Sequence, residues 1–218
     1  MSVHRLGIHP SWVIVFAGVC AALHVGKLPP ALPVLQTALG ISLVQAGFLL
    51  SAVQIASMVL GLIVGLSADR LGLRRSMLIG LALLSLASVT GGLATDVVTL
   101  LALRVLEGLG FLLVVMPAPG LIRLTVTEAA LSRRMGWWGT YMPTGSALAL
   151  LLGPWVIAGM NWSAWWWLVG LLSVLAGLAV WWWVPVIQPH ADTPPVPVWH
   201  HRLGLTLRSR SPWLLSLA

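Results

Sequence analysis

The stretch GLSADRLGLRR, residues 65–75, joins two long apolar runs and decides the fold. The runs are Val44–Ala68 and Met77–Ala94, and each is long enough to cross a bilayer, which takes about 20 mostly apolar residues. The connection between them is short, polar and basic. Gly72 lies in it and gives the backbone the freedom that a tight turn requires. The stretch therefore predicts two antiparallel membrane helices joined by a short loop.

The whole chain continues this pattern. Of its 218 residues, 59% are hydrophobic and only 8% are charged, whereas a soluble domain has about 25% charged residues. The apolar runs are continuous rather than alternating and exceed the ~10 residues of a barrel strand, so helices are favoured over strands. We predict an all-α integral membrane protein with six spans: Ser11–Leu32, Val44–Ala68, Met77–Ala94, Val97–Ile122, Gly136–Ala158 and Ala164–Val184.

Basic residues orient these spans. Arginines lie before the first span, in every second connection and after the last span: Arg5; Arg70, Arg74 and Arg75; Arg123, Arg133 and Arg134; Arg202, Arg208 and Arg210. The other connections carry only Lys27, at a helix end, and Asp96. Because positive charge favours the cytoplasmic side, we expect the N-terminus and the segment after the sixth span to be cytoplasmic, in a cell inner membrane.

Several function classes find no support in the sequence. The net charge of +7 comes from basic residues at span ends, not from a patch beside stacking aromatics, so no nucleic-acid partner is expected. Of the six histidines only His24 lies in a span, and His200 and His201 have no acidic or cysteine neighbours, so no metal site is expected. Motifs of metalloproteases, serine hydrolases and ATP-binding loops are missing. We expect no enzyme activity and no cofactor.

The loop at residues 65–75 resembles the signature loop of the major facilitator superfamily, Gly-x-Leu-Ala-Asp-Arg-x-Gly-Arg-Arg/Lys. It departs from that pattern at Ser67 and Leu73. In this family the loop is thought to act as a conformational latch. The resemblance implies that role for Gly65, Asp69, Arg70, Gly72, Arg74 and Arg75, with Arg123 as a partner of Asp69.

The fourth span carries a second resemblance to this family. Arg104, Glu107, Gly108 and Gly110 are similar to its Arg-x-x-Gln/Glu-Gly-x-Gly pattern. Arg104 lies about 10 Å into the membrane, from about seven residues at 1.5 Å each, where a charge is expensive without a cavity or partner. Glu107, three residues on, shares its face and can pair with it. A transport role and a structural ion pair both remain open.

Glycines in the spans predict close approaches between helices: Gly61 and Gly65 in the second, Gly108 and Gly110 in the fourth, and Gly145 and Gly153 in the fifth. On the fifth span, Gly139, Pro143 and the pair Gly153–Pro154 faintly resemble the family's antiporter motif. Their spacing differs, so antiport is not inferred. In all, the resemblance covers about residues 12–184.

Polar residues within the spans are the candidates for a solute or ion pathway. His24 and Lys27 lie one turn apart on one face of the first helix. With a transport role, Lys27 and Arg104 would favour an anionic or electron-rich solute, and His24 or Glu107 would carry a proton; snorkelling of Lys27 to the interface is the alternative. Further candidates, which can equally serve as interhelical hydrogen-bonding residues, are Gln54, Tyr141 and Thr144.

The family usually has twelve helices in two halves, with the solute at the midplane between them. The resemblance therefore implies a six-helix N-terminal half at residues 1–187, a cytoplasmic linker at 188–212 and the start of a truncated seventh helix at 213–218. The first hypothesis is a secondary transporter of a small solute, coupled to an ion gradient such as protons. The second is a truncated, non-transporting half or membrane scaffold that needs a second half or a homodimer partner.

Overall fold

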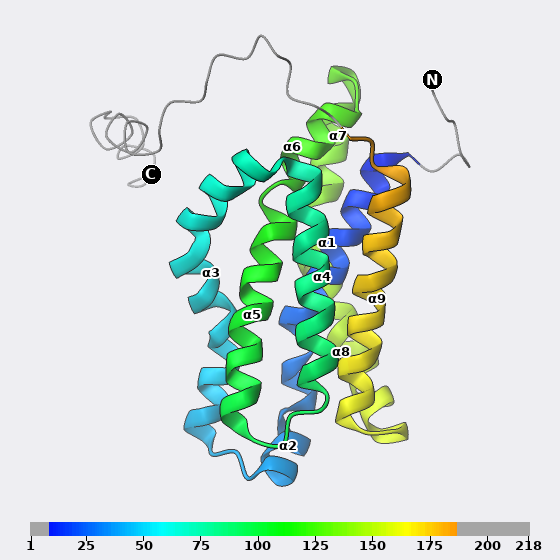
Figure 1. Cartoon of the computed structure of the whole chain (residues 1–218). Coiled ribbons are helices and arrows are strands. Elements are labelled where there is room, and N and C mark those ends of the chain that lie inside the picture. Colours follow the sequence, from blue (N-terminus) through cyan, green and yellow to red (C-terminus); the bar gives the residue numbers. More distant parts are fainter. Residues whose placement is uncertain (1–8, 187–218) are drawn as a thin grey trace, which may run out of the picture. The chain divides into compact units, whose positions relative to one another are not determined.

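The computed structural model describes residues 9–186, apart from the side chains of residues 62–70, and this part is helical throughout (Figure 1). The elements are α1 (Pro10–Gly26), α2 (Leu28–Leu39), α3 (Leu43–Leu71), α4 (Leu73–Gly91), α5 (Val97–Val115), α6 (Ala118–Thr125), α7 (Glu128–Gly139), α8 (Tyr141–Gly159) and α9 (Trp162–Trp183). Within the described residues they form six segments long and apolar enough to cross a membrane. The predicted all-α, six-span membrane fold is confirmed.

Three of the six spans are built from two helices each, which the apolar runs did not predict. The first span was expected to end at Leu32, and this is wrong: it continues through α2 to Leu39 and ends at Gly40, whose φ is 63°. Pro29 and Pro30 stand in the first turn of α2, where proline is tolerated because the N–H groups there have no helical partner. They interrupt the span at Lys27 without ending it.

The turn between α3 and α4 has the geometry that the sequence predicted. Gly72 adopts a φ of 83°, a conformation that residues with a side chain rarely take. The helices on either side therefore reverse direction across a single residue. Gly65, Asp69 and Arg70 precede this turn in the stretch whose side chains lie outside the described part.

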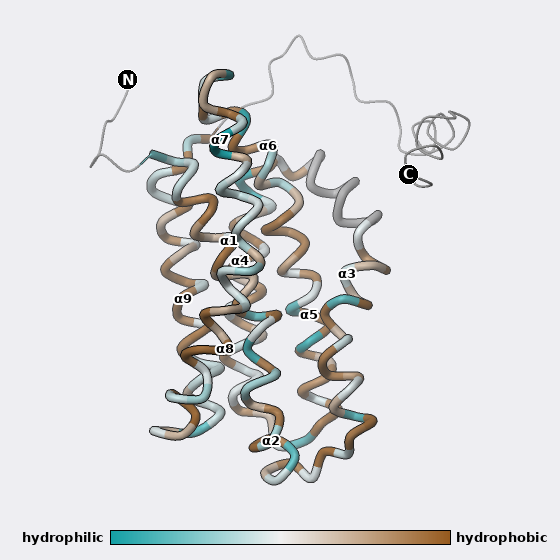
Figure 2. The backbone as a smooth tube through the Cα atoms, turned by 180° about the vertical axis from the view of Figure 1, so that it is seen from behind, coloured by the Kyte–Doolittle hydropathy of each residue, from teal (hydrophilic) through white to brown (hydrophobic). Residues whose placement is uncertain are grey.

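The first helix occupies the interior of residues 9–186. Most of α1 is buried, including Ile14, Ala17 and Ala21 at 0% exposure, as expected for a helix that is apolar on all sides. It packs against α5, α8 and α9, while α4 lies between α5 and α9 (Figure 1). Apolar residues predominate along the helices in Figure 2, and many large ones are exposed on α3, α8 and α9. These outer surfaces suit contact with lipid tails.

Glycines allow close contact of α5 with α3 and of α8 with α1. A Cβ on Gly108 would lie 2.9 Å from the Val53 carbonyl oxygen, and one on Gly145 would lie 2.7 Å from that of Val19. The expected close approaches of the fourth and fifth spans are confirmed at these positions. The expectation for Gly61 is wrong, because nothing lies within 4 Å of the position of its Cβ.

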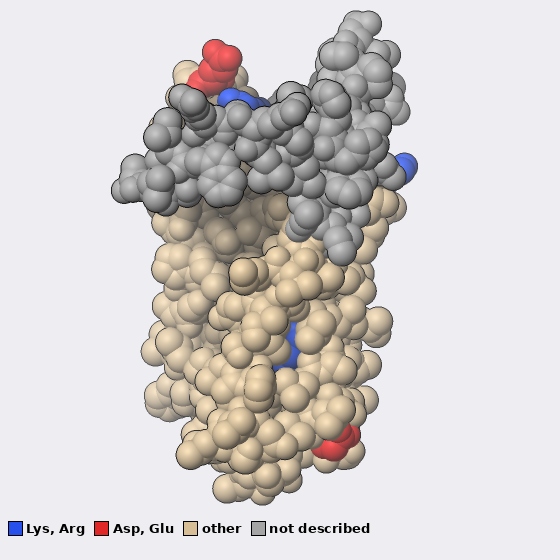
Figure 3. All heavy atoms as spheres, turned by 90° about the vertical axis from the view of Figure 1, so that its left-hand side faces the viewer, with Lys and Arg blue, Asp and Glu red and all other residues tan. Residues whose placement is uncertain are grey.

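Charged side chains separate toward the ends of the bundle. The start of α1, the α3–α4 turn and the α6–α7 connection lie at one end, and the α2–α3 and α4–α5 connections lie at the other (Figure 1). The first end thus holds Arg74, Arg75 and Arg133, and the second holds Asp96. Figure 3 shows acidic atoms at both ends, basic atoms at the upper end, and one further area of Lys or Arg atoms at mid-height of an otherwise uncharged face.

Candidate functional site

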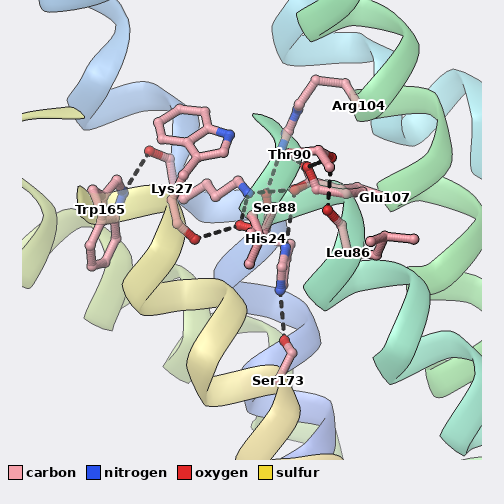
Figure 4. Close-up of polar contacts among 12 residues, drawn as sticks. His24, Lys27, Leu86, Ser88, Thr90, Arg104, Glu107, Trp165 and Ser173 are labelled. Atoms are coloured by element: carbon pink, nitrogen blue, oxygen red, sulfur yellow. Dashed lines mark hydrogen bonds and ion pairs between the residues drawn. The ribbon is translucent and has the colours of Figure 1, made fainter. Parts of the chain in front are cut away.

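Four ionisable side chains meet in the interior of the bundle (Figure 4). His24 and Lys27 come from the end of α1, and Arg104 and Glu107 come from the middle of α5. Their exposed fractions are 0%, 0%, 1% and 1%. The sequence indicated the pair on each helix separately. The packing of α1 against α5 brings the two pairs together, and we call these four residues the charged cluster.

Glu107 is the centre of the charged cluster. Its Oε1 accepts a hydrogen bond from the Lys27 ammonium and lies 3.2 Å from His24 Nδ1, and its Oε2 lies 2.5 Å from Arg104 Nη1. One carboxylate thus serves three basic groups. With a neutral imidazole, the formal charges of Lys27, Arg104 and Glu107 sum to +1.

The Lys27 ammonium is enclosed by three elements. Besides Glu107 it donates to Ser88 Oγ at 2.7 Å, and its Nζ lies 4.8 Å from the centroid of the Trp166 ring. The Ser88 hydroxyl in turn donates to the Trp166 carbonyl at 2.6 Å. A desolvated cation–π contact contributes about 2 kcal/mol. The ammonium therefore stays inside the bundle and does not snorkel to an interface.

The break between α1 and α2 contributes backbone acceptors to the site. Arg104 Nη1 donates to the His24 carbonyl at 2.7 Å, and Trp165 Nε1 donates to the Lys27 carbonyl at 3.0 Å. The His24 carbonyl lies in the last turn of α1, where carbonyls have no partner within the helix. Neighbouring side chains commonly satisfy such carbonyls within a membrane. The proline pair was the sequence signal for this break, although the predicted first span ran through it to Leu32.

His24 has a second partner that the sequence did not single out. Its Nε2 lies 2.7 Å from Ser173 Oγ on α9. A hydroxyl can either donate or accept, so His24 can be neutral or protonated while both ring nitrogens keep a hydrogen bond. Ser173 and Ser88 are small polar residues in the middle of apolar spans, which is the pattern that would have indicated interhelical hydrogen bonds.

Arg104 has a buried donor without a partner. Its Nε is buried and has no hydrogen-bond partner among the described residues. Leaving such a donor unsatisfied costs about 1–3 kcal/mol, and native structures contain few of them. The described residues contain no group of three or more metal-ligating side chains. The ionisable groups of the charged cluster can bind protons and polar or anionic groups.

The remaining pathway candidates lie apart from the charged cluster. Gln54 is exposed on α3 and Thr144 is exposed on α8. Tyr141 is half-buried and stacks on Trp138, with ring centroids 4.3 Å apart. Among the described side chains, none of the hydrogen bonds or ion pairs of the cluster involves these three residues.

Part of the predicted latch is visible at the end where α1 begins. The Arg74 guanidinium donates to the Trp181 carbonyl at 2.5 Å and lies 5.2 Å from the centroid of the Trp181 ring. Arg75 and Arg123 are exposed. The pairing of Arg123 with Asp69 stays a prediction, because the Asp69 side chain lies outside the described part.

Comparisons with known proteins place this geometry in a family. The family model described as Major Facilitator Superfamily matches residues 14–218. The tetracenomycin C resistance and export protein of Streptomyces glaucescens is 29% identical over 151 residues, which are 68% of this chain and 28% of that protein. The puromycin resistance protein of Streptomyces alboniger is 32% identical over 133 residues, which are 61% of this chain and 26% of that protein.

A solved structure agrees with the fold. The crystal structure of a bacterial homolog to the human lysosomal transporter Spinster, inward-facing and unoccupied, matches with a TM-score of 0.68 and 19% identity, over 98% of this chain and 52% of that one. The chain thus spans about half of the chain in this structure. The segments aligned with the two curated relatives cover about a quarter of the length of each relative. The family match over most of the sequence, together with six apolar helical segments, shows that this chain belongs to the Major Facilitator Superfamily.

Proposed function

We propose that this chain forms the six-helix half of a secondary transporter that moves a small solute across the cell membrane and couples this movement to protons. The observation that carries the proposal is the charged cluster, in which one buried carboxylate serves three basic groups. Buried ionisable groups in membrane spans commonly form proton relays. The cluster also joins α1 to α5, so its protonation can bias how these helices pack.

We infer which group binds and releases the proton from the formal charge of the cluster. With Lys27 charged and His24 neutral, the cluster carries +1, and after release of one proton from Lys27 it would be neutral. A further proton on His24 would raise the charge to +2. Because charge in a membrane interior is costly, the states at +1 and 0 are the favoured pair. Glu107 stays ionised in both, since it accepts from Lys27, His24 and Arg104.

The solute class is inferred from two sources. The names of two relatives state resistance to tetracenomycin C and puromycin, and one states export. Within this chain, the excess positive charge of the cluster favours a solute with an anionic or electron-rich group. We therefore infer a small organic solute of the antibiotic type, recognised in part by such a group.

The orientation follows from charge. The end that holds Arg74, Arg75 and Arg133 would face the cytoplasm, because positive charge favours that side. Residues 188–212 would then form the cytoplasmic linker. A reporter fused after Ala158 is expected to be external and one after Pro189 cytoplasmic; the reverse pattern would refute this orientation.

The coupling proposal is tested in proteoliposomes that contain the protein carrying this half. A pH gradient is imposed across the proteoliposome membrane, and puromycin or tetracenomycin C is then added. We expect the added compound to drive proton movement, which a pH-sensitive dye records. Lys27→Met, which removes the group proposed to release the proton and leaves Arg104 paired with Glu107, should abolish this movement. Glu128→Gln removes an exposed carboxylate at the start of α7 and should leave it intact. Equal proton movement in the two variants would overturn the proposal.

A second candidate is a non-transporting half or membrane scaffold that needs a second half or a homodimer partner. It predicts that the 218-residue chain alone binds neither puromycin nor tetracenomycin C in detergent. Saturable binding by the chain alone would exclude the scaffold, whereas binding that appears only with a second copy or a second half would support an incomplete cavity.

A further inference from the structure

A second arginine site lies at the end of the bundle where α1 begins. The Arg134 guanidinium carbon, from α7, lies 4.4 Å from the centroid of the Trp12 ring on α1. Trp12 in turn packs edge-to-face on Trp137, with ring centroids 5.4 Å apart. The two tryptophans therefore hold the guanidinium in one position, as arginine stacked on an aromatic face often is.

The stacked guanidinium has donors without acceptors. Arg134 Nε and Nη1 are both buried and have no hydrogen-bond partner among the described residues. No carboxylate of the described side chains lies within ion-pair distance of Arg134 either, since the ion pairs found there all belong to the charged cluster. Stacking covers the face of the guanidinium, and Nη2 is its one nitrogen that is not buried, so the N–H groups of Nη2 remain accessible. These match the oxygens of a phosphate.

The surroundings of Arg134 are apolar and open to the lipid side. Trp12 and Trp137 are 40% and 50% exposed, and Phe16, one turn after Trp12 on the same face of α1, is 43% exposed. Tryptophan at a bundle end is typical of the headgroup level of a bilayer. A group that satisfies Arg134 here would also contact this apolar surface, so it should combine a phosphate with acyl chains.

The charges near Arg134 favour an anion over a zwitterion. His9 lies close enough that burial and the positive charge of Arg134 lower its pKa below 6.5, so it is neutral at pH 7. Arg133, the preceding residue, is exposed and adds positive charge. The acid of α7, Glu128, is exposed in the first turn, before both arginines.

We propose that Arg134, stacked on Trp12 and flanked by Trp137, binds the phosphate of an anionic phospholipid headgroup at this end of the bundle. The guanidinium donates to the phosphate oxygens, and the indole rings and Phe16 contact the glycerol and upper acyl region. Such a lipid would add to the contacts between α7 and α1, which already meet through Trp12 and Trp137 and through Trp138 against Gly18. This inference is independent of the proposed transport function.

The test is native mass spectrometry of the full chain in detergent with added phosphatidylglycerol or phosphatidylcholine. We expect the chain to retain phosphatidylglycerol preferentially. Arg134→Gln should lower that retention about tenfold, the loss expected from one charge-assisted hydrogen bond. Arg133→Gln removes the same charge one residue away and should change retention by less than about twofold, since exposed charges contribute little.

Three results would overturn the proposal: equal retention of the two lipids, equal effects of Arg133→Gln and Arg134→Gln, or displacement of the lipid by excess inorganic phosphate, which would indicate a free-anion site. If Arg134→Gln fails to fold, Arg134→Lys serves in its place. It keeps the charge and loses the planar fork, so retention of phosphatidylglycerol should fall several-fold. Unchanged retention in that variant would contradict a site built on the guanidinium.

Discussion

Basic side chains lie in two regions of this bundle. The groups that offset the cost of removing these charges from water differ between the two regions. In the interior, Lys27 and Arg104 are fully buried and share the Glu107 carboxylate. At the end where α1 begins, Arg74 and Arg134 lie over Trp181 and Trp12 instead. The interior cations depend on one acid, whereas the arginines at the end rely on aromatic rings and surroundings that water and lipid headgroups can reach.

This difference determines how each region should respond to substitution. In the interior, removing one partner leaves the others charged in a low-dielectric environment, and breaking a buried pair is therefore strongly destabilising. At the end, a lost contact can be replaced by water, so each contact contributes about as much as a surface pair. Four tests follow, each of which measures the free energy of unfolding in detergent.

The largest effect is expected from Glu107→Gln. The substitution leaves Lys27 and Arg104 buried without a counter-charge and raises the formal charge of the cluster from +1 to +2. We expect a loss of about 3–5 kcal/mol in the free energy of unfolding, measured by denaturant titration. Glu128→Gln, at an exposed position, should change it by about 0.5 kcal/mol or less.

A double variant shows whether charge causes that loss. Lys27→Met in the Glu107→Gln background restores the formal charge of the cluster to +1 and fills the space with an apolar chain of similar length. Part of the lost stability should return, as when buried ion pairs are replaced by apolar residues. Additive losses in the double variant would show that packing, not charge, dominates the interior.

The second effect separates packing from charge within the interior. A Cβ on Gly80 of α4 would lie 2.7 Å from the Gly110 carbonyl oxygen of α5, so Gly80→Ala should force α4 and α5 apart. We expect a cost of about 1–3 kcal/mol, the usual range for overpacking. Gly47→Ala meets nothing within 4 Å and should stabilise α3 by about 0.5–1 kcal/mol. Effects of the same sign would contradict the described approach of α4 to α5.

A smaller effect is expected at the bundle end. Arg74→Gln removes the cation–π contact with Trp181 and the hydrogen bond to its carbonyl. Because the site is partly exposed, we expect a loss of about 0.5–1 kcal/mol. The denaturant titration used for Glu107→Gln also measures the free energy of unfolding of Arg74→Gln, so the two losses can be compared directly. A loss as large as that of Glu107→Gln would remove the distinction between the two regions.

The smallest effect concerns the opposite end, where Asp96 caps α5. Its side chain accepts from Thr99 N at 2.8 Å and from the Thr99 hydroxyl at 2.7 Å, and these bonds lower its pKa below the ordinary value of 3.8. A lowered pKa stabilises the fold above pH 3.8, and this contribution is lost as the pH falls through the lowered value. Asp96→Asn keeps the cap without the charge, so its stability should vary less between pH 5 and about pH 2. Equal pH profiles would contradict this role.

Much of the architecture was predictable because it depends on residues that are close together in the sequence. Continuous apolar runs gave the six spans, and the loop at residues 65–75 gave the turn at Gly72, whose positive φ requires a residue without a side chain. The pairing of Arg104 with Glu107 also follows from spacing alone, since residues three apart share a helix face. The extension of the first span from Leu32 to Leu39 was not predicted, because prolines usually mark the end of a helix, whereas Pro29 and Pro30 stand in the first turn of α2.

The sequence by itself determined that this chain is a six-span membrane protein with ionisable residues in its first and fourth spans. Only the tertiary structure decided that these residues form one cluster. Lys27 and Glu107 are 80 positions apart, and no periodicity relates residues on different helices. Their contact depends on the packing of α1 in the interior. The glycines that let α1, α4, α5 and α8 approach closely act through contacts with residues on other helices. The hydrogen bonds of Ser88 and Ser173 to the charged cluster were not predictable for the same reason.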